Sequence, residues 1–105
     1  MKIIKSKDLK KLLESGDVLL IDVRNPEEYE KKCIDGSCLI PLSEISAENI
    51  PATTKKIVIN CGIGKRSEMA CNKILSENPN LEVYSLEGGI DAWQKEGFEV
   101  KKSGA

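Results

Sequence analysis

Two short segments with consecutive apolar residues, the runs at 18–23 (VLLIDV) and 55–59 (KKIVI), constrain the fold more than any other feature of the sequence. Neither run shows the strict alternation of apolar and polar residues that marks a half-buried strand. Continuous runs of this length are typical of strands that are covered on both faces, as in a parallel sheet between helices. Because helical patterns separate these runs from each other and from a third run at 81–86, the sequence predicts an α/β fold with a mainly parallel sheet.

The segments between and after these runs carry the spacing and the end signals of helices. Ser6 is a candidate N-cap, and Gly16 is expected to end the helix that follows it. After residue 66, apolar side chains recur at offsets of three and four residues, which places them on one helical face. Gly88 and Gly89 are expected to allow a tight turn close to the loop that follows the run at 55–59. The predicted helices cover 6–16, 25–29, 42–49, residues from 67 and residues from 88, and a brief strand is expected over 38–40.

The composition indicates a single globular domain over residues 1–105. Of the 105 residues, 40% are hydrophobic and 31% are charged, and 16 Lys and Arg nearly balance 17 Asp and Glu. This balance lacks the basic footprint of a nucleic-acid-binding protein. The sequence has no apolar run close to the ~20 residues that span a bilayer, and its charged start is unlike a signal peptide. We therefore expect a cytoplasmic monomer without nucleic-acid or membrane partners.

The chain contains no histidine. This absence excludes Ser-His-Asp and Cys-His catalysis and every zinc site that needs an imidazole. No two of the cysteines stand in CxxC spacing, so we expect free thiols and neither a metal nor another cofactor. Cys38 and Cys71 are interpreted as core residues, and Cys33 as a half-exposed thiol without a role rather than a second reactive one. The four cysteines are Cys33, Cys38, Cys61 and Cys71.

The candidate site is the loop after the run at 55–59. Cys61 follows that run directly, the glycines Gly62 and Gly64 allow a tight loop, and a helix comes next. The amides of such a loop and of the first helical turn lack internal partners and form an anion-binding nest. We expect Cys61 at the mouth of this nest, where the amides and the cations Lys65 and Arg66 favour thiolate over thiol. The alternative interpretation of Cys61 is a small buried hydrophobic residue.

The segment Cys61–Ser67, which reads CGIGKRS, resembles the active-site loop of rhodaneses, whose single-domain members carry Cys-x-x-Gly-x-Arg-Ser. The resemblance extends over nearly the whole chain. It implies a rhodanese-like fold, with a central, mainly parallel five-stranded sheet flanked by helices on both faces. The chain departs from the family at Lys32-Cys33-Ile34, where Gly-His-Ile is common. The other matching stretches, in the same order as in the family, are Asp22-Val23-Arg24 with Glu28-Tyr29, Ile34–Ser37 leading to Ile40-Pro41, and Leu86–Trp93.

The resemblance implies a sulfurtransferase that moves sulfane sulfur from thiosulfate or a persulfide donor to a thiol, or to cyanide, through a persulfide on Cys61. The loop amides would stabilise the terminal sulfur of that persulfide. Arg66 is assigned to anion binding and loop support, and Lys65 either attracts an anionic donor from the rim or is a solvated side chain. The implied partners are a small anionic sulfur donor and a thiol acceptor, including a protein persulfide. The loop residues are Gly62, Ile63, Gly64, Lys65, Arg66 and Ser67.

Two alternatives and two supporting residues complete the interpretation. Phosphatases of the same fold have a longer Cys-x5-Arg loop, whereas four residues separate Cys61 from Arg66 here, which is the sulfurtransferase spacing. A noncatalytic rhodanese-like module, which relays sulfur or binds a protein, remains an alternative function.

Asp22 is interpreted as a structural hydrogen-bonding residue, because a carboxylate within an apolar strand needs hydrogen-bond partners when it is buried. Arg24 is expected to form an ion pair with Asp22 or Glu28, and the alternative is that it lines the mouth of the pocket.

Overall fold

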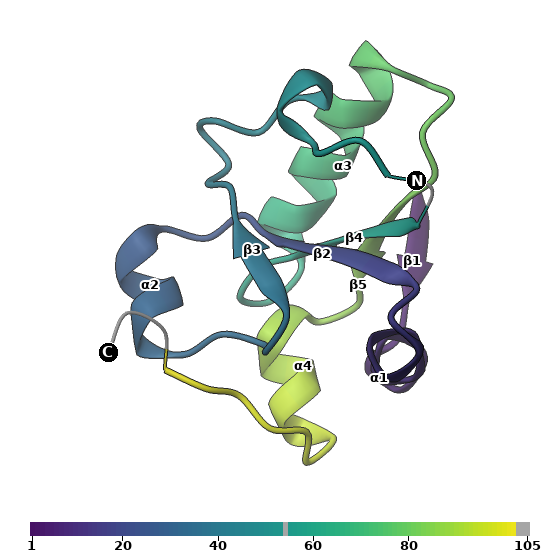
Figure 1. Ribbon diagram of the computed structural model, residues 1–105. Helices are drawn as coiled ribbons and strands as arrows, with labels where there is room; N and C mark the ends of the chain where they lie inside the picture. The colour runs from purple at the N-terminus through teal and green to yellow at the C-terminus, as the bar shows by residue number, and fades with distance from the viewer. Residues whose placement is uncertain (54, 103–105) are drawn as a thin grey trace.

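The computed structural model describes residues 1–53 and 55–102. They form a five-stranded sheet in the order β1-β5-β4-β2-β3, in which all neighbouring strands are parallel (Figure 1). This arrangement confirms the predicted α/β class. None of the helices in this part of the chain combines the length and the apolar character needed to cross a bilayer. The elements are β1 (Lys2–Ile4), α1 (Ser6–Ser15), β2 (Val18–Asp22), α2 (Pro26–Lys31), β3 (Ser37–Leu39), the 3-10 turn η1 (Ala47–Asn49), β4 (Lys56–Asn60), α3 (Lys65–Glu77), β5 (Val83–Leu86) and α4 (Gly89–Lys95).

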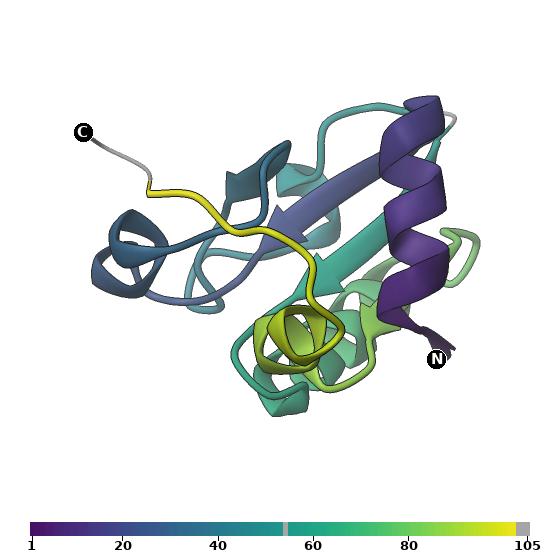
Figure 2. The ribbon, with the colours of Figure 1, turned by 90° about the horizontal axis from the view of Figure 1, so that it is seen from below.

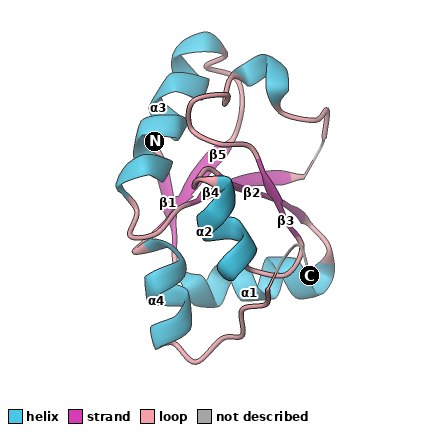
Figure 3. Ribbon diagram, turned by 90° about the vertical axis from the view of Figure 1, so that its left-hand side faces the viewer, coloured by secondary structure: helices cyan, strands magenta, loops and turns pink. Residues whose placement is uncertain are grey.

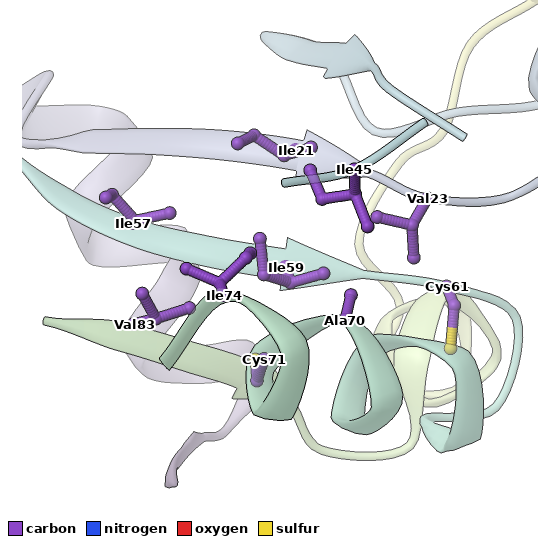
Figure 4. Packing of buried hydrophobic residues seen from close by; sticks show 10 residues of the cluster. All are labelled: Ile21, Val23, Ile45, Ile57, Ile59, Cys61, Ala70, Cys71, Ile74 and Val83. Carbon is purple, nitrogen blue, oxygen red and sulfur yellow. The ribbon is translucent and has the colours of Figure 1, made fainter. Parts of the chain in front are cut away.

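Helices cover both faces of the sheet, as predicted. One face packs against α3 and η1, and the other packs against α1 and α4, which Figure 2 shows from below. Because side chains alternate along a strand, Ile57 and Ile59 of β4 pack on the α3 side whereas Val58 packs with α1 and α4. Figure 4 shows the α3 side of this core, where Ile74 lies against the strand side chains. A strand that contributes to two cores must be apolar at consecutive positions, which explains the continuous run in β4.

The carboxyl ends of the parallel strands meet at one edge of the sheet. The short helix α2 lies beyond this edge, as Figures 1 and 3 show. Its start agrees with the prediction, because Pro26 is the first helical residue and the carboxylate of Glu28 accepts a hydrogen bond from the N–H of Asn25 at 3.1 Å. The loop that follows β4 emerges at the same edge, so α2 and this loop are neighbours although they are distant in sequence.

The predicted helix over 42–49 is wrong. Only the turn Ala47–Asn49 is helical there, and the hydroxyl of Ser46 accepts a hydrogen bond from the N–H of Asn49 at 3.3 Å. The N–H of Leu42 donates to the carbonyl of Val23 at 3.0 Å, and the N–H groups of Glu44 and Ile45 both donate to the carbonyl of Pro41, so residues 42–44 form a single turn beside the segment after β2. This tertiary pairing overrides a weak helical pattern.

The amino-terminal segment also differs from its prediction. Lys2–Ile4 forms the edge strand β1, which pairs with β5 and which the sequence did not predict. Ser6 is the first residue of α1 rather than its cap, because the extended residue at the junction is Lys5 and no side chain caps the helix. The strand leads directly into the helix and leaves no residue for a capping turn. Gly16 ends α1 with a left-handed φ of 77°, as predicted.

Candidate active site

Cys61 lies at the start of the loop that joins β4 to α3, and α3 begins at Lys65, two residues before the predicted start. The Sγ atom of Cys61 accepts a hydrogen bond from the N–H of Gly64 at 3.0 Å. Gly64 has a φ of 108°, a conformation that side chains disfavour, so a glycine here allows the chain to pass from the loop into α3. The Cys61 side chain is fully buried and points to the α3 side of the sheet (Figure 4). The thiol therefore lies beneath the loop and not at its mouth, where it was expected.

The first turn of α4 binds the outer side of this loop. The N–H of Ile90 donates to the carbonyl of Cys61 at 2.9 Å, and the N–H of Asp91 donates to the carbonyl of Gly62 at 3.1 Å. In a trans peptide the C=O and N–H point in opposite directions, so the amides of Gly62 and Ile63 point away from α4. Helix α4 thus fixes the orientation of the two peptide groups that follow Cys61.

Several amides around the thiol lack main-chain partners. Within the described residues, the N–H groups of residues 62, 63 and 65–67 donate to no main-chain carbonyl. Three of these belong to the first turn of α3, where helical geometry leaves the amides free. The positive end of the helix dipole lies at the same place. Free amides at a helix amino terminus favour an anionic group, and the anion-binding role of this loop stays a prediction.

Gly89 allows the close approach of α4 to the loop. A Cβ atom at this position would lie 2.5 Å from the carbonyl oxygen of Cys61 and 2.6 Å from the carbonyl carbon and oxygen of Gly62. Its φ of 62° is also in the left-handed region. A side chain larger than hydrogen would push the helix and the loop apart, so Gly89 serves the loop as well as the turn.

Ser67 supports the loop from below. Its buried hydroxyl donates to the carbonyl of Gly64 at 2.9 Å and lies 2.6 Å from the hydroxyl of Ser85 in β5. Because the Ser67 hydroxyl has one proton, which Gly64 accepts, Ser85 donates to Ser67. The sequence interpretation missed Ser85. A small polar residue in an otherwise apolar strand was the signal that could have revealed it.

Arg66 pairs with α2 through Glu28. The Nη1 and Nη2 atoms of Arg66 donate to the two carboxylate oxygens of Glu28 at 2.7 and 3.1 Å. This bidentate pair joins the loop to α2 and gives the guanidinium an anionic partner, while the anion-binding role expected for Arg66 stays a prediction. The Nη2 atom of Arg66 lies 3.1 Å from the position that a Cβ atom on Gly62 would occupy. The guanidinium therefore lies against the loop at Gly62. Ile63 and Lys65 both point outward into solvent.

We expect Glu28 to make stability depend on pH. The hydrogen bond from Arg66 is the main cause that lowers the pKa of Glu28 from 4.5 to about 2. A carboxyl with a lowered folded-state pKa stabilises the fold above its unfolded pKa, and this contribution is lost as the pH falls through the folded value. Because the two side chains are 34% and 39% exposed, the contribution should be only ~1 kcal/mol.

Urea unfolding of the wild type and Glu28→Gln measures this contribution. The free energies of unfolding should differ by ~1 kcal/mol above pH 4.5 and converge as the pH falls to about 2. A difference that stays constant down to the lowest pH would contradict the assignment of the pair as the cause.

Asp22 and Arg24 form a buried ion pair, which decides between the two partners expected for Arg24. The carboxylate of Asp22 accepts from the main-chain N–H of Arg24 at 2.9 Å and from Nη2 at 2.8 Å. Arg24 also donates to the carbonyl of Lys32 at 2.7 Å, and the amide of Asn60 donates to Asp22 at 3.3 Å. The cluster joins the ends of β2, α2 and β4. Because Arg24 is only 2% exposed, it supports this end of the sheet and does not line the mouth of the loop.

The other cysteines lie outside this loop, and all four thiols are free, as expected. Cys33 is fully buried, so its interpretation as half-exposed is wrong. Its N–H and C=O both pair with Lys101 at 2.8 Å, and this carboxyl-terminal segment covers it. Burial raises the pKa of the Cys71 thiol to about 12 and also raises the pKa of the half-buried Cys38 thiol. Both are packing residues.

Comparisons with known proteins agree with this geometry. A family model described as the rhodanese-like domain matches residues 5–96. A protein named sulfurtransferase from Allochromatium vinosum is 34% identical over 92 residues, which cover 86% of this chain and 84% of that protein. The chain spans about half the length of several other curated relatives.

Solved structures show the same fold. A rhodanese-related protein from Thermoplasma volcanium superposes with a TM-score of 0.81 at 30% identity, covering 96% of this chain and 98% of that one. A thiosulfate sulfurtransferase from Pseudomonas aeruginosa gives a TM-score of 0.88 over 97% of this chain and 20% of that one, and its 21% identity supports the fold alone. The family model, the curated relative and the shared fold lead to one conclusion: the chain belongs to the rhodanese-like domain family.

Proposed function

We propose that this protein is a sulfurtransferase that carries sulfane sulfur as a persulfide on Cys61. The observation that carries the proposal is the contact between the Gly64 amide and Sγ, in a loop whose neighbouring amides have no main-chain partners. Hydrogen bonds from preorganised amides stabilise a sulfur anion without a histidine. The chain has no histidine, so this electrostatic activation is the activation that its residues offer.

The proposed reaction has two half-reactions. In the first, the Cys61 thiolate attacks the sulfane sulfur of the donor, the bond between that sulfur and the rest of the donor breaks, and the electron pair leaves with sulfite or a thiolate. In the second, an acceptor thiolate or cyanide attacks the outer sulfur of the persulfide, and Cys61 leaves as a thiolate. Charge and atoms balance in both steps, and no oxidant is consumed. The loop amides stabilise the anion that forms on the outer sulfur.

The burial of Cys61 restricts the shape of the donor. A terminal sulfane sulfur is a single atom at the end of a narrow molecule, and it can reach a thiol that lies under a loop. A tetrahedral phosphoryl group needs a wider ring of amides than four residues between Cys61 and Arg66 provide. The donor and acceptor that we propose are therefore a small sulfane compound and a thiol, and free-thiol chemistry of this kind suits the cytoplasm.

A sulfur relay without efficient turnover is the second candidate. Ile63 is 64% exposed at the tip of the loop, and an apolar rim suits a protein partner better than a small anion. In a relay the same persulfide forms on Cys61, but its acceptor is a thiol of another protein.

Intact mass spectrometry and a turnover assay test the proposal. After incubation with thiosulfate or an organic persulfide, the protein should gain the mass of one sulfur, and peptide mapping should locate it on Cys61. Turnover from thiosulfate to cyanide then separates the two candidates, because a relay accepts sulfur but turns over slowly. A protein that acquires no sulfur from either donor would refute both.

A further inference from the structure

Glu28 neutralises one of the two cations of the loop around Cys61, and the other, Lys65, is exposed to solvent. Arg66 and Lys65 are the cations of the loop sequence, and the bidentate pair with Glu28 neutralises Arg66. Arg24, the remaining arginine near this end of the sheet, is neutralised by Asp22. An anionic donor that approaches the loop therefore meets the carboxylate of Glu28 next to the guanidinium.

Glu28 cannot easily move away from this position. Its carboxylate accepts hydrogen bonds from Arg66 and from the N–H of Asn25, so it is held from the loop and from the start of α2 at once. The Arg66 guanidinium lies close to Gly62, the residue next to the nucleophile. A donor bound at Cys61 is thus within range of both charges, and each negative charge that it carries is repelled by Glu28.

Candidate sulfur donors differ in charge. Thiosulfate is a dianion, and its transfer expels the sulfite dianion. An organic persulfide carries at most one negative charge on its sulfane sulfur and expels a thiolate or a thiol. In either case the Cys61 thiolate forms the new S–S bond as the old one breaks, so the charge of the donor is what distinguishes them at this site.

We propose that Glu28 is a specificity-determining residue, which disfavours dianionic donors such as thiosulfate and makes organic persulfides the preferred donors of the site. This inference rests on the proposed function. It assigns to the ion pair a role in donor choice in addition to its support of the loop. The pKa of about 2 agrees with it, because the carboxylate stays charged wherever thiol chemistry proceeds.

The test compares two donors in three proteins, the wild type, Glu28→Gln and Glu27→Gln. Gln at position 28 can still accept the hydrogen bond that caps α2, so the fold is expected to be kept, and circular dichroism checks it. Glu27 is the matched control, because it is exposed in the same helical turn. The donors are thiosulfate and 2-hydroxyethyl persulfide, and kcat/KM for loading of Cys61 is measured for each.

In the wild type we expect a higher kcat/KM for the persulfide than for thiosulfate. Glu28→Gln should shift the ratio toward thiosulfate by about five- to tenfold, mainly through KM, since one negative charge is removed from the loop beside Cys61. High salt should reduce the shift. Glu27→Gln should leave the ratio unchanged. A ratio that does not move in Glu28→Gln, or that moves equally in both variants, overturns the inference.

Alkylation of Cys61 provides a readout that does not depend on sulfur transfer. Iodoacetate and iodoacetamide have similar size and differ in charge, and peptide mapping follows each reagent at Cys61. Glu28→Gln should raise the rate ratio of iodoacetate to iodoacetamide by about threefold or more, whereas Glu27→Gln should not. If this ratio shifts but no donor loads sulfur, the proposed function is wrong and the charge selectivity stands. If sulfur loads but neither ratio shifts, the function stands and the role of Glu28 is wrong.

Discussion

Replacement of Cys61 by Ser is expected to abolish sulfur transfer, with a loss of at least ~1,000-fold in kcat/KM. Serine fits the buried position, and its Oγ can accept the hydrogen bond from the N–H of Gly64 that Sγ accepts in the wild type. The loop should therefore keep its structure, while a hydroxyl cannot form the S–S bond on which both half-reactions depend. Mass spectrometry should find no added sulfur on the variant.

The matched control for this variant is Cys38→Ser. Cys38 is a half-buried thiol in β3 that lies outside the loop. Its replacement should leave loading and turnover within about twofold of the wild type. If Cys61→Ser transferred sulfur at the native rate, or if Cys38→Ser lost activity to the same extent, Cys61 would not be the sulfur carrier.

Gly89→Ala is expected to have the second largest effect. The added Cβ would lie 2.5–2.6 Å from main-chain atoms of Cys61 and Gly62, and main-chain atoms cannot move aside as a flexible side chain can. The helix α4 must then move away from the loop, which breaks the bonds from Ile90 and Asp91 that orient the loop peptides. A displacement of ~1 Å at the nucleophile lowers the rate by ~100-fold or more. We expect this loss in the loading assay, together with destabilisation by more than ~2 kcal/mol.

Gly16→Ala separates the steric effect from the conformational one. Gly16 also has a positive φ, of 77°, but a Cβ there would meet no atom within 4 Å. This variant should lose only the ~1–2 kcal/mol that a side chain costs in the left-handed region, and its loading rate should not change. Equal losses of activity in the two variants would show that the close approach of α4 does not control the loop.

Local patterns were sufficient to predict most of the elements and the position of the loop around Cys61. The runs in β2 and β4 are apolar at consecutive positions because each strand contributes to the cores on both faces. The loop around Cys61 was predictable because its geometry depends on neighbouring residues, a strand end, two glycines and the first turn of a helix. Three of the free amides near the thiol follow from the start of α3, whereas the peptide groups directly after Cys61 are oriented by α4, which is distant in sequence.

Elements that depend on distant pairing could not be predicted in this way. The strand β1 has only three residues and is defined by its pairing with β5, at the other end of the chain. The segment 42–49 has a weak helical pattern, but its start is fixed by a hydrogen bond to Val23. Ser6 has the chemistry of a cap, yet the strand before it decides where the helix begins.

The partners of the site residues are also distant in sequence. Glu28 and Arg66 are 38 residues apart, and only the arrangement of α2 beside the loop brings them together. Ser67 and Ser85 meet in the same way, from α3 and β5. Cys33 is buried by a segment near residue 101, which no local signal could indicate. The sequence therefore predicts the place of Cys61 in the fold better than it predicts the groups that position the loop.

Side chains along β4 alternate between the two faces of the sheet, so the position of the Cys61 thiol depends on the register of this strand. Cys61 continues the side of β4 that faces α3, whereas the preceding Asn60 faces the opposite side, where it donates to Asp22. If β4 paired with β2 one residue out of register, residues 60 and 61 would exchange faces of the sheet. The side-chain amide of Asn60 would then lie where the Cys61 thiol lies in this structure. Sequence changes far from the loop that misalign β4 would then give a protein that is folded but chemically inert.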